Sequence, residues 1–172
     1  MSASWKEPAD YKSRPVSVLG GGVLGRRIGA CFVAAGHHVR IRDPSEKART
    51  DAVTYIKENI GSFTALTSHA PGTYEAVESV ADAVKDSWLV FEAVPEVLSI
   101  KQDTFAELEK LAPDDCILAT NSSSYKSSEM ITKIQDATKQ RVLNTHFMMP
   151  PAVSAHYRIR GPTNRILNFL RR

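Results

Sequence analysis

The feature that most constrains the fold is a glycine-rich stretch at residues 20–25, Gly-Gly-Gly-Val-Leu-Gly. It follows a short apolar run at residues 16–19 and precedes a stretch with apolar residues at helical spacing. An alternating run at residues 39–42 then ends in Asp43. This order predicts a strand, a tight turn, a helix and a second strand, the setting in which G-x-G-x-x-G is typical of dinucleotide binding. The alternative is a glycine turn that only packs a helix on a sheet.

Each glycine of the motif has its own physical reason. Gly20 permits the tight turn, Gly22 lets a pyrophosphate approach the backbone, and Gly25 lets the helix lie close to the sheet. The free N–H groups of the first helical turn face the phosphates. The candidate cofactor contacts in this stretch are therefore Gly20, Gly22, Val23, Leu24 and Gly25.

The acid that ends the second strand bears on the choice of cofactor. The carboxylate of Asp43 can accept hydrogen bonds from the ribose hydroxyl groups of NAD, whereas it would repel the 2′-phosphate of NADP. Arg40 and Arg42 stand beside it and weaken this preference. The sequence therefore predicts NAD as the cofactor.

Further apolar runs predict an α/β fold of the Rossmann type, a doubly wound, mainly parallel sheet with helices on both faces. The predicted strands are residues 88–91, 117–119 and 142–145, and the predicted helices are residues 45–61 with Gly61 as the stop, 81–85, 99–111 and 130–134. In helix 99–111 we expect Ile100, Phe105, Leu108 and Leu111 to face inward. Lys101, taken alone, is expected to be a solvated lysine.

Polar residues follow one predicted strand after another, and in a doubly wound sheet these strand ends share one crevice. They are Gly20, Asp43, Glu96, Asn121 with Ser123, and His146. His146 suits proton transfer, because an imidazole titrates near neutrality. Ser123 suits a hydrogen bond to a substrate oxygen. In the alternative interpretation the histidine is structural and the serines cap the following helix.

Composition excludes several other classes. No C-x-x-C or H-E-x-x-H pattern argues for a metal, and Cys31 and Cys116 are expected to be core thiols in a reducing compartment. We expect an intracellular, cytoplasmic protein, because no signal peptide and no apolar run of about 20 residues is present. Residues 152–172 contain five arginines and no acid, so the net charge of +3 arises there and does not indicate nucleic-acid binding.

Three motifs in order resemble the NAD-binding domain of the 3-hydroxyacyl-CoA dehydrogenase family. They are the stretch from Gly20 to Asp43, the stretch Phe-Glu-Ala-Val-Pro-Glu at residues 91–96 through Lys101, and Asn-Ser-Ser-Ser at residues 121–124 followed by His-Phe-Met-Met-Pro at residues 146–150. The resemblance spans residues 14–151. It implies NAD-dependent oxidation of the 3-hydroxyl group of an acyl-CoA or a related 3-hydroxy acid.

The resemblance also implies roles for individual residues. His146 corresponds to the catalytic base and Ser123 to the serine that contacts the substrate hydroxyl. Glu96, Lys101 and Asn121 are expected at the cofactor, with Asp43 on the adenosine ribose. We expect no nucleic-acid or membrane partner, and a homodimer only where the family's helical domain is present.

The chain departs from the family pattern in three places. Met149 stands where an asparagine is common, and a subgroup with this methionine is associated with other 3-hydroxy acids. The family has a glutamate about a dozen residues after the histidine that orients the imidazole, and here no acid follows Asp136. Third, the family continues into a helical domain, which we do not expect in this chain.

These departures keep two other functions open. One is a dehydrogenase of a free hydroxy acid or sugar acid, and the other is a truncated, non-catalytic NAD-binding module. For the domain organisation we expect a flexible lead-in at residues 1–14, the NAD-binding domain at 15–151, and an atypical basic tail at 152–172, which a shifted reading frame would explain.

Overall fold

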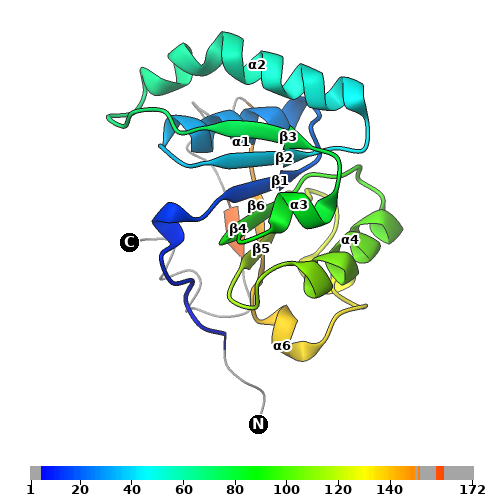
Figure 1. The fold of residues 1–172 in the computed structure, drawn as a ribbon. Coiled ribbons are helices and arrows are strands. Elements are labelled where there is room, and N and C mark those ends of the chain that lie inside the picture. Colours follow the sequence, from blue (N-terminus) through cyan, green and yellow to red (C-terminus); the bar gives the residue numbers. More distant parts are fainter. Residues whose placement is uncertain (1–4, 150, 152–157, 161–172) are drawn as a thin grey trace.

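A computed structural model describes residues 5–149, 151 and 158–160. Its centre is a seven-stranded sheet in the order β3-β2-β1-β4-β5-β6-β7, in which the first six pair in parallel and β7 runs antiparallel (Figure 1). The strands are β1 (Val16–Leu19), β2 (Val39–Arg42), β3 (Tyr74–Val77), β4 (Leu89–Glu92), β5 (Ile117–Thr120), β6 (Val142–His146) and β7 (Arg158–Arg160). The predicted doubly wound Rossmann-type fold is confirmed.

Helices cover both faces of this sheet, as the apolar strands require. They are α1 (Val23–Ala34), α2 (Glu46–Thr64), α3 (Val80–Val84), α4 (Leu98–Leu111), α5 (Ser127–Met130) and α6 (Asp136–Lys139), with a 3₁₀ turn, η1 (Tyr11–Ser13). α1 packs against α2 on one face, and α3 packs against α4 on the other (Figure 1).

Alternation along the strands divides the core into two clusters. In β4, Leu89 and Phe91 join the cluster beneath α1, whereas Val90 joins the cluster beneath α4. Glu92 continues the phase of Val90, and its side chain is buried at the end of the strand on the α4 side. Because Glu92 is on the same side of β4 as Val90, its carboxyl group lies at the carboxyl edge of the sheet, the edge where the parallel strands end.

Several predicted helix boundaries were wrong. α2 passes through Gly61 to Thr64, because Phe63 adds another buried apolar residue beyond the glycine. The helix predicted at 130–134 is absent, and short helices lie on either side of a turn there. Strand β3 was not predicted, since at the sheet edge none of its residues is fully buried.

The inner face of α4 also differs from the prediction. Ile100 and Leu111 are both 41% exposed, whereas Lys101 is only 1% exposed. Lys101, Phe105 and Leu108 stand at i, i+4 and i+7, so they share one side of the helix. The lysine therefore belongs to the buried stripe and is not solvated.

From residue 5 onward, the segment for which we predict a flexible lead-in packs against the domain. Trp5 is 6% exposed, and its indole N–H donates to the Asp115 carbonyl oxygen at 3.0 Å. Tyr11 packs edge-on against Trp88. Arg14 forms a two-pronged ion pair with Asp115 at 2.7 and 2.9 Å. The segment covers the amino edge of the sheet, which is the edge where the parallel strands begin.

Most of the predicted basic tail lies outside the described residues. Its described part is β7, whose Arg158 is in register with His146 and whose Arg160 is in register with Asn144. Cys116 is buried and Cys31 is partly buried, and both are free thiols. Burial raises the pKa of Cys31 to about 11 and that of Cys116 to about 12. No helix in the described part of the chain could cross a membrane.

Candidate active site at the carboxyl edge of the sheet

The glycine-rich turn leaves β1 at the switch point of the sheet, where β1 and β4 are neighbours. Gly20 has a φ of +116°, and a Cβ there would lie 2.3 Å from the Ala93 carbonyl oxygen. A Cβ on Gly25 would lie 1.8 Å from the Gly20 carbonyl oxygen, whereas one on Gly22 would meet nothing within 4 Å. Two glycines are therefore required by packing, and the third leaves open space at the start of α1, where a phosphate group could approach.

Asp43 follows β2 and faces this turn. Its two carboxylate oxygens accept hydrogen bonds from the backbone N–H groups of Gly21 at 2.8 Å and Ser45 at 2.9 Å. The acid is thus held directly beside the glycine-rich turn.

The two arginines beside Asp43 have partners on β3 and on the segments that flank α3. Arg40 donates to Glu75 at 2.9 Å and to the Lys85 carbonyl oxygen at 2.7 Å. Arg42 donates to the Glu78 carbonyl oxygen at 2.9 Å. A third arginine, Arg49, donates to the Asp43 carbonyl oxygen at 2.9 Å, so the carboxylate of Asp43 stands among several cations.

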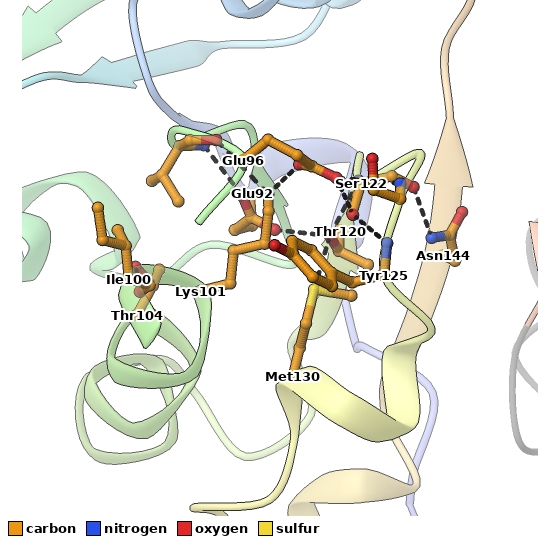
Figure 2. A network of polar contacts seen from close by, with 12 residues as sticks. Glu92, Glu96, Ile100, Lys101, Thr104, Thr120, Ser122, Tyr125, Met130 and Asn144 are labelled. Atoms are coloured by element: carbon orange, nitrogen blue, oxygen red, sulfur yellow. Dashed lines mark hydrogen bonds and ion pairs between the residues drawn. The ribbon is translucent and has the colours of Figure 1, made fainter. Parts of the chain in front are cut away.

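A buried ionic network joins the end of β4 to the first turn of α4 (Figure 2). Lys101 Nζ lies 2.7 Å from Glu92 Oε1 and 3.0 Å from Glu96 Oε2. Glu92 is fully buried, whereas the side chain of Glu96 is 37% exposed. Partial burial opposes ionisation of Glu96, but hydrogen bonds from Ser122, Lys101 and the Ser124 N–H group outweigh it and lower the pKa of this carboxyl group.

The serine loop, residues 121–125, follows β5 and uses its three serines differently. Ser122 donates its hydroxyl to Glu96 and accepts from the Tyr125 N–H group at 3.1 Å, so it is the serine that closes the turn. The Ser124 N–H group also donates to Glu96. The exposed Ser123 hydroxyl has no hydrogen-bond partner among the described residues.

His146 ends β6 beside this loop. Ser122 to Ser127, Asn144 and His146 line one cavity of about 280 Å³. Asn121 ties the two strand ends together, because its side-chain oxygen accepts from the Phe147 N–H group at 2.8 Å. The half-buried His146 imidazole has no hydrogen-bond partner among the described residues. The structure thus places Ser123 and His146 on one cavity.

The other histidines lie elsewhere. His38 contacts Thr73 and Glu75 beside β3, and His37 packs against Phe32 and Trp88 near the start of β2. His69 lies in an exposed loop, and His156 lies outside the described residues. Within those residues, no group of three His, Cys, Asp or Glu side chains could hold a metal ion.

Sequence reasoning placed Glu92, Thr120 and Ser122 at the ends of strands but gave none of them a role in the site. Thr120 donates to Glu92 Oε2 at 2.6 Å, and both side chains lie on the α4 side of neighbouring strands. The signal for two of them was available, since Glu92 and Thr120 are polar residues that end otherwise apolar strands, whereas Ser122 lies two residues beyond β5. A buried strand seldom ends in an acid unless the acid has a partner.

The chain is similar to known dehydrogenases over this domain. A family model described as "3-hydroxyacyl-CoA dehydrogenase, NAD binding domain" matches residues 15–156. The chain is 31% identical to a peroxisomal fatty acid beta-oxidation multifunctional protein, MFP2, from Arabidopsis thaliana, with 81% of this chain and 20% of the relative covered. It is 34% identical to a 3-hydroxyacyl-CoA dehydrogenase from Gibberella moniliformis, with 80% and 43% covered.

Among solved structures, the fold is similar to that of a 3-hydroxybutyryl-CoA dehydrogenase from Escherichia coli. The TM-score is 0.74 at 27% identity, and the alignment covers 86% of this chain and 32% of that one. The chain therefore spans less than half the length of each of these three proteins. What it shares with them is the domain that carries the glycine turn, the serine loop and the histidine.

Proposed function

The chain belongs to the 3-hydroxyacyl-CoA dehydrogenase family, whose matching domain binds NAD, and we propose that its carboxyl edge oxidises the 3-hydroxyl group of an acyl-CoA or a related 3-hydroxy acid. One observation carries this proposal: Ser123 and His146 line the same cavity, and neither side chain has another hydrogen-bond partner among the described residues. Two unengaged polar groups on one cavity are available to a substrate oxygen.

The residues around the glycine turn fit NAD. Gly22 leaves room for the pyrophosphate, the first turn of α1 supplies N–H groups, and Asp43 is held where a ribose would lie. The cofactor contacts we propose are Gly20, Gly22, Val23, Leu24 and Gly25 at the pyrophosphate, Asp43 at the adenosine ribose, and Asn121 towards the nicotinamide end. NAD, when bound, accepts a hydride from the substrate carbon.

The protein side chains handle the proton of the hydroxyl group. An imidazole nitrogen of His146 accepts this proton during oxidation and returns it during reduction of the ketone. The Ser123 hydroxyl donates a hydrogen bond to the same substrate oxygen, which fixes its position. Phe147, directly after His146, packs edge-on against Phe91 in the core beneath α1 and so anchors the end of β6.

The cavity also favours a second substrate class, a free hydroxy acid. Lys126 lines the cavity, its side chain is exposed, and its ammonium group forms no ion pair among the described residues. A carboxylate close to the reacting carbon would find a partner there, whereas a thioester carries no charge at that position. Reduction of acetoacetate would indicate the free-acid class, and reduction of acetoacetyl-CoA would indicate the thioester class.

The test is oxidation of NADH by the purified 172-residue chain after addition of either compound. We expect turnover with at least one of them, and a loss of about 10²–10⁴-fold in kcat for His146→Asn. His38→Asn is the matched control, since that histidine lies beside β3 and should leave turnover unchanged. A chain that binds NADH but turns over neither compound would be a non-catalytic NAD-binding module.

A further inference from the structure

Lys101 has no N–H group to spare for a ligand. Its ammonium carries three donors, and the nearest acceptors are Glu92 Oε1 at 2.7 Å, Glu96 Oε2 at 3.0 Å and the Val94 carbonyl oxygen at 3.5 Å. Its side chain is 1% exposed. A buried lysine with two carboxylates serves the protein structure first, because an unpaired ammonium would be costly at this depth.

Glu96 is turned towards the serine loop. One of its carboxylate oxygens, Oε1, accepts from the Ser122 hydroxyl and, at 3.0 Å, from the Ser124 N–H group. The other, Oε2, faces Lys101. The two hydrogen bonds to the loop are made on either side of Ser123, the residue whose own hydroxyl remains unengaged.

A second connection reaches the same loop through Glu92. Thr120 donates to Glu92 Oε2 at 2.6 Å and accepts from the Ser122 N–H group at 3.1 Å. Lys101 is therefore connected to the loop by two routes. One runs through Glu96 to Ser122 and Ser124, and the other runs through Glu92 and Thr120 to Ser122. Figure 2 shows these contacts running from α4 across the ends of β4 and β5 towards Asn144 on β6.

We propose that Glu96 and Lys101 are positioning residues, which hold the serine loop so that the Ser123 hydroxyl faces the cavity that His146 lines. In this role they act through Ser122 and Ser124 and do not need to contact the cofactor. The consequence for turnover rests on the proposed dehydrogenase function, whereas the hold on the loop does not.

Amide hydrogen exchange tests the hold directly. The N–H groups of Ser124 and Tyr125 both donate into the network, to Glu96 and Ser122 respectively. We expect Glu96→Ala to speed exchange at these two amides by about tenfold or more, and Glu96→Gln, which keeps one acceptor, to have a smaller effect. Exchange in β1 should not change.

Two further variants complete the test. Lys101→Met alone leaves Glu92 buried without its cation and risks unfolding, so the double variant Lys101→Met with Glu92→Gln removes both charges together. It should also speed exchange at Ser124. The matched control is Lys47→Met, which breaks an exposed ion pair with Asp51 at 2.7 Å and should leave the loop unchanged.

Binding and turnover distinguish positioning from direct contact. If Glu96 positions the loop, Glu96→Ala lowers kcat by about tenfold or more while the Kd for NADH rises by less than about threefold. Unchanged exchange in the loop, or a tenfold rise in the Kd for NADH at unchanged exchange, would overturn the proposal. If no form of the chain turns over substrate, the dehydrogenase proposal fails, and the exchange rates alone still decide whether the loop is held.

Discussion

The two edges of the sheet use their polar groups in opposite ways. At the amino edge, Arg14 donates to Asp115 and to the carbonyl oxygens of Ala9, Asp86 and Ser87, and Arg141 donates to two further carbonyl oxygens. At the carboxyl edge, Ser123 and His146 have no such partners among the described residues, and the space beside Gly22 is open. The arginines of the amino edge are engaged by groups of the protein, although a cavity of about 500 Å³ lies beside Asp115 and Arg141. The carboxyl edge leaves Ser123 and His146 available to ligands.

This difference separates stability from binding. Changes at the amino edge should alter the free energy of unfolding and leave cofactor affinity intact, whereas changes in the exposed groups of the carboxyl edge should do the reverse. Residues that pack both the sheet and the glycine turn should affect both properties.

The largest effect is expected at Gly25, because this residue contributes both to stability and to the glycine turn that binds the cofactor. Gly25→Ala places a methyl group 1.8 Å from the Gly20 carbonyl oxygen, so α1 must move away from β1. We expect a loss of about 3 kcal/mol in the free energy of unfolding, together with loss of NADH binding. Urea denaturation and a fluorescence titration measure the two, and unchanged values would refute the packing described for the turn.

A smaller effect is expected at the amino edge. Arg14→Ala removes an ion pair that is only partly exposed and leaves carbonyl oxygens without a donor. We expect the free energy of unfolding to fall by about 1–2 kcal/mol, measured in urea, with an unchanged Kd for NADH. A rise of tenfold in that Kd would contradict the separation of the two edges.

The same ion pair makes stability depend on pH. The hydrogen bond from Arg14 lowers the pKa of Asp115 in the folded chain. The ion pair therefore contributes fully to the free energy of unfolding above the pKa of Asp115 in the unfolded chain, about 3.9. This contribution is lost as the pH falls through the lower pKa of the folded chain. Asp115→Asn should be less stable than the parent chain at pH 7, and the gap should narrow by pH 3. Urea midpoints at the two pH values test this, and a constant gap would contradict it.

The smallest effect is expected at Gly61, inside α2. A Cβ there meets nothing within 4 Å, and the residue is exposed. Gly61→Ala should raise the free energy of unfolding by about 0.5–1 kcal/mol, because alanine favours helix over glycine. This variant is the matched control for Gly25→Ala, since both add one methyl group to a helix. A loss of stability would show that α2 does not continue past this residue as a regular helix.

The sequence predicted the carboxyl edge better than the amino edge. Motif spacing and apolar runs located Gly20, Asp43, Ser123 and His146 at strand ends, because parallel strands bring their carboxyl ends together. Nothing local showed that Trp5 or Arg14 would pack, since their partners lie about a hundred residues away at Asp115.

Lys101 shows where local reasoning failed within the site itself. A lysine on the first turn of a helix is most often exposed, and only its helical phase with Phe105 and Leu108 places it inside. Its carboxylate partners are Glu92 at the end of β4 and Glu96 in the loop that follows, nine and five residues earlier in the chain. Strand alternation turns Glu92 to the α4 side, and this shows that a buried carboxylate partner is available to Lys101.

The most direct test of the carboxyl edge as an NAD site is a titration of the purified chain with NADH, following nicotinamide fluorescence, for the parent and for Gly22→Val. A Cβ at this position meets nothing within 4 Å, so we expect the substitution to change stability little. Saturable binding by the parent, with a Kd at least about tenfold higher for Gly22→Val, is the expected result. Equal affinity in the two proteins, or no binding by a folded parent chain, would contradict the assignment.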